Sequence, residues 1–430
     1  MTNAIRRERN VAPLRSAGGP LPQGVHGAAD PSFATVVRAF SAMFPSRFLG
    51  GGALSVYLDG VPVVDVWTGW ADRWGTRRWD ADTGAMVFSA TKGLASTVIH
   101  RLADRGLIGY DVPVAEYWPA FAANGKAGVT VRELMRHRAG LSQLNGATRD
   151  ELMDHRLMEQ RLAAAPMSWM KGRPAYHAIT YGWLLSGLAR AVTGQSMREL
   201  FRTELAEPLG IDGLHLGRPA ADAPTQPAQI IGPQFRIRNP LVDVVAPHVA
   251  KLPFSGGFGS MYFTGMRSMA QGDTPLLDSE MPGANGVATA RALGRVYGAL
   301  ANGGQMDGLR FLSAGTVAQL RGTGSVFPDL GLGLPMDFNL GYHGLPFPGL
   351  MPGFGHVGLG GSLGWADPDR GLAFGFVHNR LLTPLMVADQ AGFVALGAMV
   401  RHGAAQARSN GFCRVAEFGA PYADPAPVAG

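Results

Sequence analysis

The feature that most narrowly limits the fold is a pair of short apolar segments on either side of an Asp-Gly pair. Residues 53–58 (Ala-Leu-Ser-Val-Tyr-Leu) and 62–67 (Pro-Val-Val-Asp-Val-Trp) flank Asp59 and Gly60, and Asp-Gly is a dipeptide that closes tight hairpins. Residues 31–48 carry apolar side chains near helical spacing, which predicts an amphipathic helix. We therefore expect the core to begin with a helix and an antiparallel hairpin.

The later parts of the chain alternate in the same way between helical and strand-like patterns. Residues 108–217 are mostly helical in pattern, and 289–301 and 386–405 predict two further helices. The Gly-rich segment 355–379 contains apolar runs that predict strands. Together these patterns indicate an α+β fold, in which an antiparallel sheet is flanked by N- and C-terminal helices and joined to a mostly helical domain.

Changes of pattern also suggest where the domains begin and end. Residues 218–282 are rich in Pro, Gly and Ala and lack periodicity, which predicts a long irregular excursion over the surface or the active-site mouth. The expected units are a disordered basic tail (1–30), a discontinuous sheet domain (31–106 and 286–405), a helical domain that includes the excursion (107–285) and a C-terminal tail (406–430).

Composition excludes several classes of protein. With 430 residues, 46% of them hydrophobic, the chain can bury a large core. The net charge of +6 is spread along the chain, and no run of Lys and Arg is interleaved with aromatic residues, so we expect no nucleic-acid partner. The histidines show no metal-ligand spacing, so neither a metal nor another cofactor is expected. Cys413 is the only cysteine, which excludes an intramolecular disulfide.

The sequence also bears on location. Pro or Gly interrupts the apolar runs before they reach the roughly eighteen residues that a membrane span requires, so none is expected. Arg6 and Arg7 resemble a twin-arginine export signal, but no apolar region follows through Asp30. The expected location is therefore cytoplasmic by default, with association with the cell envelope left open. The oligomeric state is not predicted.

The first candidate for chemistry is Ser89-Ala-Thr-Lys92, an S-x-x-K sequence. The apolar run 86–88 leads into it and helical spacing follows, so both side chains should share one face near a helix N-terminus. The alternative is a surface lysine one turn along a helix. A serine hydroxyl needs a base, yet the ordinary pKa of lysine is about 10.4, and lowering it by three units takes about 4 kcal/mol. The mechanism therefore requires a third group.

Tyr176 can supply that group. It follows a Gly-Arg-Pro turn at 172–174 and precedes a predicted helix, so its side chain can project from a loop. A nearby Lys92 cation would lower the pKa of the phenol, while burial would lower the pKa of the lysine.

Three ordered motifs resemble those of the class C β-lactamase-like family, which also contains D-Ala-D-Ala peptidases and family VIII carboxylesterases. They are Phe88-Ser-Ala-Thr-Lys92, Tyr176-His-Ala178 and the segment 354–368 around His356-Val-Gly358, supported by shorter matches at 131–141, 192–194, 207–210 and 301–304. The resemblance covers about residues 31–405. It implies a fold like that of β-lactamases and penicillin-binding proteins.

The resemblance also implies roles for particular residues. The backbone N–H groups of Ser89 and Leu359 would form the oxyanion hole, and His356 and Gly358 would lie at the substrate. His177, next to Tyr176, is a further candidate for substrate binding, with packing at the helix start as its alternative.

Two departures from the β-lactamase pattern favour ester hydrolysis. His356 stands where β-lactamases usually have Lys, and Ala178 stands where they usually have Asn. The predicted function is an esterase or lipase that cleaves esters of short to medium acyl chains, or a lipid, through an acyl-enzyme on Ser89. The alternatives are β-lactamase or D-Ala-D-Ala peptidase activity, and a non-catalytic binding module on the same fold.

Three other segments have competing interpretations. Ser362 lies in a G-x-S-x-G sequence, but the residues after it predict a hairpin rather than the helix that such a nucleophile requires. Residues 50–52 (Gly-Gly-Gly) resemble an oxyanion loop but precede a strand. Aromatic and apolar side chains in the excursion could line an acyl pocket or simply pack the loop: Phe235, Pro253, Phe254, Phe258, Met261, Tyr262 and Phe263.

Overall fold

A long antiparallel sheet forms the centre of the structure, a computed structural model that describes residues 20–144, 146–232, 272–322, 327–345, 349–381 and 386–415. The Asp59-Gly60 turn joins its strands β2 and β3, as predicted. Within the described residues the strand order is β1-β3-β2-β15-β14-β13-β12-β11-β10, with every neighbouring pair antiparallel. The strands are β1 (Val25–Ala29), β2 (Gly51–Leu58), β3 (Val61–Gly69), β10 (Phe327–Pro328), β11 (Pro335–Asn339), β12 (Tyr342–Gly344), β13 (Phe354–Val357), β14 (Leu363–Asp367) and β15 (Leu372–His378).

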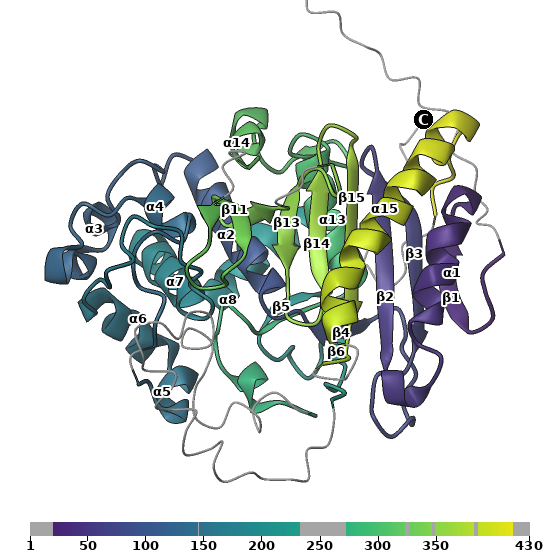
Figure 1. The fold of residues 1–430 in the computed structure, drawn as a ribbon, viewed down its shortest axis with the longest axis horizontal. Coiled ribbons are helices and arrows are strands. Elements are labelled where there is room, and N and C mark those ends of the chain that lie inside the picture. Colours follow the sequence, from purple (N-terminus) through teal and green to yellow (C-terminus); the bar gives the residue numbers. More distant parts are fainter. Residues whose placement is uncertain are drawn as a thin grey trace, which may run out of the picture.

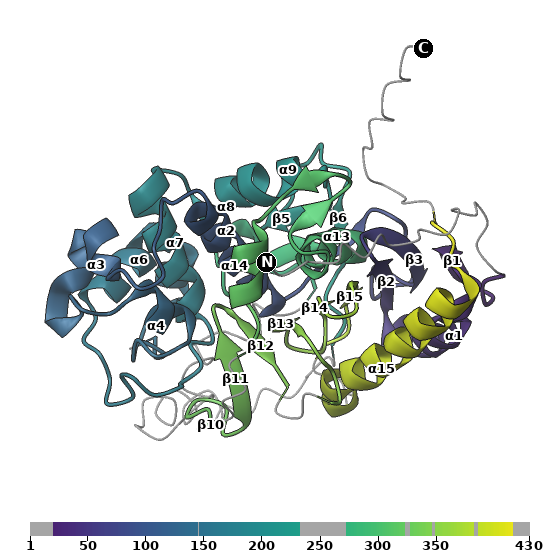
Figure 2. The same ribbon diagram turned by 90° about the horizontal axis from the view of Figure 1, so that it is seen from above.

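Helices cover both faces of this sheet (Figures 1 and 2). Helices α1 (Ala34–Ala42) and α15 (Met386–Asn410) pack on one face, and α2 (Ala90–Asp104) and α13 (Ala290–Ala301) pack on the other. Alternate residues of a strand point to opposite faces, so Leu54 and Val56 of β2 join the core under α1 and α15, whereas Tyr57 joins the core around α13. The sheet is thus buried on both sides.

The mostly helical part lies at one side of the sheet (Figure 1). Its elements are α3 (Val114–Tyr117), η3 (Pro119–Gly125), α4 (Val131–Met135), α5 (Arg149–Met153), α6 (His155–Ala164), α7 (Thr180–Thr193), α8 (Met197–Leu200), η4 (Phe201–Ala206) and α9 (Glu207–Leu209). Thr130 and Thr148 each form a capping box with the glutamate three residues later, which fixes the starts of α4 and α5.

A second, smaller sheet connects the helical part to the centre. Its strand order is β5-β7-β4-β6, with bounds Leu214–Leu216 for β5, Gly286–Ala288 for β7, Thr83–Met86 for β4 and Gln226–Pro227 for β6. The remaining elements are η1 (Pro31–Phe33), η2 (Arg47–Leu49), η5 (Pro275–Asp278), β8 (Gln305–Met306), β9 (Leu309–Arg310) and α14 (Ala314–Gln319).

The expected tails were too long at both ends. Residues 25–29 of the predicted tail 1–30 form β1, because their backbone groups pair with β3 at the edge of the sheet. Helix α15 continues to Asn410, and the backbone N–H of Val415 donates to Pro62 O at 3.0 Å, so residues 406–415 are packed as well. Residues 1–19 and 416–430 lie outside the described part.

The opening helix is shorter than residues 31–48, since it spans Ala34–Ala42 and is followed by the separate turn η2. Segment 107–285 is not wholly helical, because β5 and β6 belong to the second sheet. Strands β11 and β12 had no sequence prediction. Most of the expected excursion, residues 233–271, lies outside the described part, and so do all the side chains suggested for an acyl pocket.

Among the described residues, no helix has both the length and the apolar character that crossing a bilayer requires.

Candidate active site

Ser89 lies where strand β4 gives way to helix α2. The connecting residue Val87 donates its N–H to Gly286 O at 2.8 Å, which ties the segment to β7. Phe88 has a φ of 47°, a conformation that a bulky residue rarely adopts and that costs about 1–3 kcal/mol. Helix α2 starts directly afterwards with Ser89 as its N-cap. The predicted position of Ser89 near a helix N-terminus is confirmed, and the strained turn leaves its side chain half-buried.

Lys92 lies one helical turn farther along α2 and is fully buried. Its Nζ is 3.0 Å from Ser89 Oγ and donates to Gly283 O at 2.6 Å. No carboxylate lies within ion-pairing distance of this amine among the residues that the structure describes. Gly283 did not feature in the sequence prediction, because it is 191 positions away along the chain.

Tyr176 lies in the loop before α7, as predicted, and it meets the same serine. Its phenol hydrogen-bonds with the Ser89 side chain, and Lys92 Nζ lies 5.0 Å from the centre of its ring. The three side chains predicted to carry the chemistry therefore lie together, with Ser89 between the lysine and the tyrosine.

Burial acts on the two helpers in opposite senses. Removal from water disfavours the ammonium, so the pKa of Lys92 is held well below its usual range. The same effect raises the pKa of the Tyr176 phenol; the hydrogen bond from Ser89 lowers it and the nearby Asp329 carboxyl raises it further. The site thus favours a neutral amine beside a neutral phenol. The sequence-based expectation that the lysine would act as a cation on the phenol is not favoured here.

The predicted oxyanion donors are not used by other described parts of the protein. In the described part of the chain, the N–H groups of Ser89 and Leu359 donate to no protein acceptor, whereas the neighbours of Leu359 do. Gly358 brings the two segments together, because a Cβ at this position would lie 2.1 Å from the carbonyl oxygen of Val87. Close backbone packing beside Ser89 therefore accounts for a glycine at this position, and its contact with substrate stays a prediction.

The two predicted histidines differ in what their ring nitrogens do. His177 is buried; its Nδ1 lies 2.6 Å from Ala175 O and its Nε2 accepts from the N–H of Leu141 at 3.1 Å. Both nitrogens are used in holding backbone, which supports the packing alternative over substrate binding. His356 Nδ1 lies 3.1 Å from Val357 O, while its Nε2 is buried without a hydrogen-bond partner in the described structure.

Burial lowers the pKa of His356 well below its usual value, so the ring is neutral and Nε2 presents a lone pair. His356 therefore cannot supply the positive charge of the lysine that it replaces. Within the described residues no group of histidine, cysteine or carboxylate side chains is placed to hold a metal ion.

Asp329 is a residue that the sequence analysis missed. It is fully buried, and its Oδ1 accepts from the N–H groups of Tyr176 at 3.0 Å, Gly331 at 2.8 Å and Leu332 at 2.9 Å. Desolvation raises the pKa of this carboxyl. The loop after β10 therefore holds the backbone of the tyrosine. The only sequence signal is an Asp followed by alternating glycines, which indicates a turn but not its partner.

The ring of Tyr176 packs against two other rings. It stacks on Phe338 of β11 at 5.3 Å between ring centres and lies 4.9 Å from the ring of His137. His137 Nδ1 accepts from the N–H of His177 at 3.1 Å. His137 thus packs against the site and bonds to the backbone next to Tyr176.

The competing serine is in a different setting. Ser362 lies between strands β13 and β14 with no helix after it, as the predicted hairpin requires. It is buried, and its Oγ accepts from the N–H of His378 at 3.2 Å. Gly51 and Gly52 of the sequence 50–52 are the first two residues of β2, so this sequence belongs to the strand that it was expected to precede rather than to an oxyanion loop.

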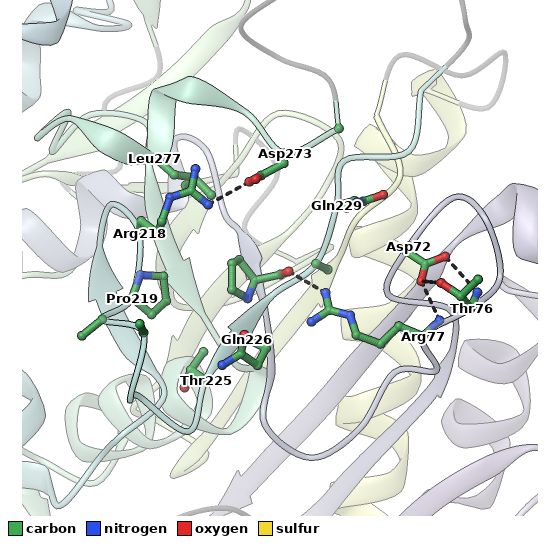
Figure 3. A pocket seen from close by; sticks show the side chains of 15 residues that line it. Asp72, Thr76, Arg77, Arg218, Pro219, Thr225, Gln226, Gln229, Asp273 and Leu277 are labelled. Atoms are coloured by element: carbon green, nitrogen blue, oxygen red, sulfur yellow. Dashed lines mark hydrogen bonds and ion pairs between the residues drawn. The ribbon is translucent and has the colours of Figure 1, made fainter.

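A pocket of about 450 Å³ lies apart from this site. Figure 3 shows it between the loop that carries Asp72 and Arg77 and the segments that carry Arg218, Gln226 and Asp273. Its lining includes none of the three predicted catalytic side chains.

Comparisons with known proteins place this geometry in a family. The chain is 63% identical over 407 residues to the Esterase/beta-lactamase LipL of Mycobacterium tuberculosis, with 94% of this chain and 95% of the relative covered. A solved penicillin-binding protein homologue from Caulobacter crescentus has a TM-score of 0.72 at 30% identity, covering 88% of this chain and 99% of the other. A solved family VIII carboxylesterase gives the same TM-score and identity over 87% of this chain and 99% of its own.

The fold expected from the resemblance, a β-lactamase and penicillin-binding-protein-like arrangement of an antiparallel sheet and helices, is confirmed by these neighbours. A sequence model described as Beta-lactamase matches residues 33–399. The chain belongs to the beta-lactamase family.

Proposed function

We propose that this protein is a serine hydrolase that cleaves carboxylic esters through an acyl-enzyme on Ser89. The observation that carries the proposal is the 3.0 Å distance between Ser89 Oγ and the buried Lys92 Nζ, in a site that favours the neutral amine. A neutral amine within hydrogen-bonding distance can accept the proton of a serine as its oxygen attacks.

The first half-reaction uses the groups already described. Ser89 Oγ attacks the ester carbonyl carbon and its proton passes to Lys92 Nζ. The carbonyl oxygen becomes an oxyanion that the N–H groups of Ser89 and Leu359 stabilise. When the intermediate collapses, the bond to the alcohol breaks, and the Tyr176 phenol donates a proton to the leaving alkoxide. The Lys92 ammonium then gives its proton to the Tyr176 phenolate, which returns both groups to their neutral forms.

The second half-reaction follows the same route with water. Water attacks the acyl carbon and its proton passes to the neutral Lys92 amine; the bond to Ser89 then breaks, and Lys92 returns the proton to the Ser89 oxygen. The acid is released and the serine is protonated again, so one ester and one water give one acid and one alcohol. The chemistry needs no cofactor.

Esters of short to medium acyl chains are the preferred substrate class, although a lipid ester fits the same chemistry. A β-lactam carries a carboxylate that a cation at position 356 would attract, and His356 is neutral here. Ala178 lacks an amide for an antibiotic side chain. β-Lactam hydrolysis is the second candidate, because the 63% identical relative is named for both esterase and beta-lactamase activity.

The test is a rate series on p-nitrophenyl esters of increasing chain length beside the chromogenic cephalosporin nitrocefin. We expect kcat/KM to be far higher for the butyrate ester than for nitrocefin, and Ser89→Ala to abolish both activities. A fluorophosphonate probe should label the peptide that contains Ser89. A label on another serine, or equal kcat/KM for the two substrates, contradicts the proposal.

A further inference from the structure

Two loops at one corner of the central sheet expose aromatic rings together with arginines. Phe48 in the turn η2 is 69% exposed, and Trp74 in the loop between β3 and β4 is 57% exposed. Arg47, Arg73 and Arg78 beside them are exposed as well. We name this set, with the half-buried Trp70, the Trp74 surface. Removing a large aromatic side chain from water lowers the free energy, so the exposure of several such side chains in one place requires an explanation.

Each arginine of the Trp74 surface lies over an aromatic ring. The guanidinium carbon of Arg47 is 4.9 Å from the ring centre of Phe48, that of Arg73 is 4.5 Å from Trp74, and that of Arg78 is 3.5 Å from Trp70. Arg47 also donates to Trp74 O at 3.2 Å, which joins the two loops. The rings and charges therefore form one ordered surface rather than separate exposed side chains.

The arginines of this surface are not held in ion pairs with other described residues. None of its arginines has a carboxylate within ion-pairing distance in the part of the chain that the structure describes. Asp72 is the one acidic residue of the loop 70–78, but it is buried, and its oxygens accept from the N–H groups of Gly75, Thr76 and Arg77 and from the Thr76 hydroxyl. The surface is thus suited to an anionic partner.

The Trp74 surface and the predicted oxyanion loop, which carries Leu359, lie at the same end of the strands of the central sheet. The C-terminal end of β13 and the C-terminal end of β3 lie at the same end of the strands. This follows from the register across the sheet, in which the successive pairs are Val357 with Leu363, Leu363 with Phe376, Phe376 with Leu54, and Leu54 with Val66. Leu359 follows that end of β13, and the loop 70–78 follows the end of β3. In Figure 1 the loops of the Trp74 surface lie below β2 and β3.

We infer that the Trp74 surface docks the protein on an anionic lipid surface. Trp and Phe insert at the boundary between head groups and acyl chains, and arginines next to them are attracted by anionic head groups. Docking through this end of the sheet would place the predicted oxyanion loop on the side of the protein that faces the lipid. The inference concerns binding alone and does not depend on the proposed ester hydrolysis.

The test measures sedimentation of the full-length protein with vesicles of phosphatidylcholine that contain about one quarter phosphatidylglycerol. We expect wild-type protein to bind these vesicles, to bind pure phosphatidylcholine at least about tenfold more weakly, and to be released by about 0.5 M NaCl. Trp74→Ala and Arg73→Glu should each weaken binding on the order of tenfold.

Leu309→Ala and Arg310→Glu are the matched controls. They change an exposed apolar residue and an exposed arginine in the β8–β9 hairpin. This hairpin lies at the other end of the strands, where the β2–β3 turn is. Asn302 links the two, because its side chain bonds to Gln305 O of the hairpin and lies against Gly60 of that turn. Both controls should bind vesicles like wild type.

Hydrolysis of a soluble p-nitrophenyl ester is measured for every variant and should be unchanged, which separates a docking defect from a folding defect. Equal binding of neutral and anionic vesicles, equal loss of binding in the controls, or no vesicle binding by active wild-type protein overturns the inference. So does a lipid-free dimer that Trp74→Ala dissociates, since a second copy would then cover the surface.

Discussion

Lys92 and Lys126 are both fully buried, yet their surroundings differ in one respect. Each Nζ lies near the centre of an aromatic ring, that of Lys92 at 5.0 Å from Tyr176 and that of Lys126 at 5.5 Å from Phe121. Lys126 Nζ donates to two backbone carbonyls, of Ala123 and Ala165. Lys92 Nζ donates to one carbonyl and faces a serine hydroxyl in the other direction.

That difference separates a structural lysine from one that can do chemistry. Carbonyl oxygens can only accept hydrogen bonds, so the surroundings of Lys126 use its N–H groups and offer it no proton. A serine hydroxyl can donate its proton to a neutral amine. Burial lowers the pKa of both lysines, so a lowered pKa alone does not identify the reacting one. The neighbouring hydroxyl does.

The largest expected effect comes from exchanging each lysine for methionine. Lys92→Met should lower kcat/KM for p-nitrophenyl butyrate by at least about 10³-fold, because Ser89 loses its proton acceptor. Lys126→Met should keep near wild-type kcat/KM but destabilise the fold, since two carbonyls lose their donor at about 1–3 kcal/mol each. Thermal melting and ester kinetics on both variants check this. A fully active Lys92→Met enzyme would remove the distinction between the two lysines.

Tyr176→Phe tests the other neighbour of Ser89. The change keeps the ring on Phe338 and removes only the hydroxyl, so we expect kcat to fall by about 10²- to 10⁴-fold, the usual scale for a proton-transfer group.

Because Lys92 and Tyr176 are proposed to pass one proton, their losses should not add, and the double variant should be scarcely slower than the poorer single variant. Measurement of kcat/KM for all four forms on one ester decides the matter. Additive losses, or a Tyr176→Phe rate near wild type, would assign the tyrosine a packing role.

The pH dependence of kcat/KM sharpens the comparison further. The reaction needs the neutral form of Lys92, so kcat/KM should fall as the pH is lowered through the depressed pKa of this lysine. Below that pKa, kcat/KM should decrease about tenfold for each pH unit. The midpoint should lie well below the ordinary value of about 10.4. Lys126→Met should leave this profile unmoved, because Lys126 has no proton to exchange with Ser89. A rising limb centred near the ordinary lysine value would contradict the role given to Lys92.

The sequence predicted the part of the site that depends on local geometry. Ser89 and Lys92 are one helical turn apart, so a correct helix prediction placed them together. Tyr176 was predicted from its place after a turn and from the resemblance of its motif to that of the family. The acceptor Gly283 and the anchor Asp329 could not be predicted, because their contacts join residues 191 and 153 positions apart and neither residue has a pattern that names its partner.

The same reason explains the successes and omissions in the fold. Strands β2, β3 and β15 are long and apolar, so their patterns were clear. Strands β11 and β12 have only five and three residues, too few for a strand pattern to stand out, and they form because neighbouring strands complete their backbone hydrogen bonds. Burial, which sets the pKa of Lys92 and Tyr176, depends on such contacts and could not be deduced from composition.

Asp329 should have a smaller effect, because it acts on the site through the backbone of Tyr176. Asp329→Ala removes the acceptor of three N–H groups, and we expect kcat to fall about tenfold with KM little changed. Asp329→Asn should restore most of the rate, since its amide oxygen can accept the same bonds. It should also shift the alkaline side of the pH profile to lower pH, because the Asp329 charge that raises the pKa of Tyr176 is gone. Two equally impaired variants with unchanged profiles would indicate a purely structural residue.

The smallest expected effect on activity belongs to Ser362, whose G-x-S-x-G sequence is otherwise the strongest competitor of Ser89. Its hydroxyl accepts from the N–H of His378 in a buried position, so Ser362→Ala leaves that donor unpaired and should cost about 1–3 kcal/mol of stability. The bond from the N–H of Gly358 goes to the backbone oxygen of Ser362 and survives the change, so the loop that carries Leu359 keeps its position. Activity on p-nitrophenyl butyrate should therefore stay within about twofold of wild type. Ser89→Ala is the matched control and should show the opposite pattern, a folded protein of near wild-type melting temperature without activity. If Ser362→Ala melted normally but lost its ester hydrolysis, the nucleophile would have to be sought between β13 and β14, and the contrast between Lys92 and Lys126 would carry no catalytic meaning.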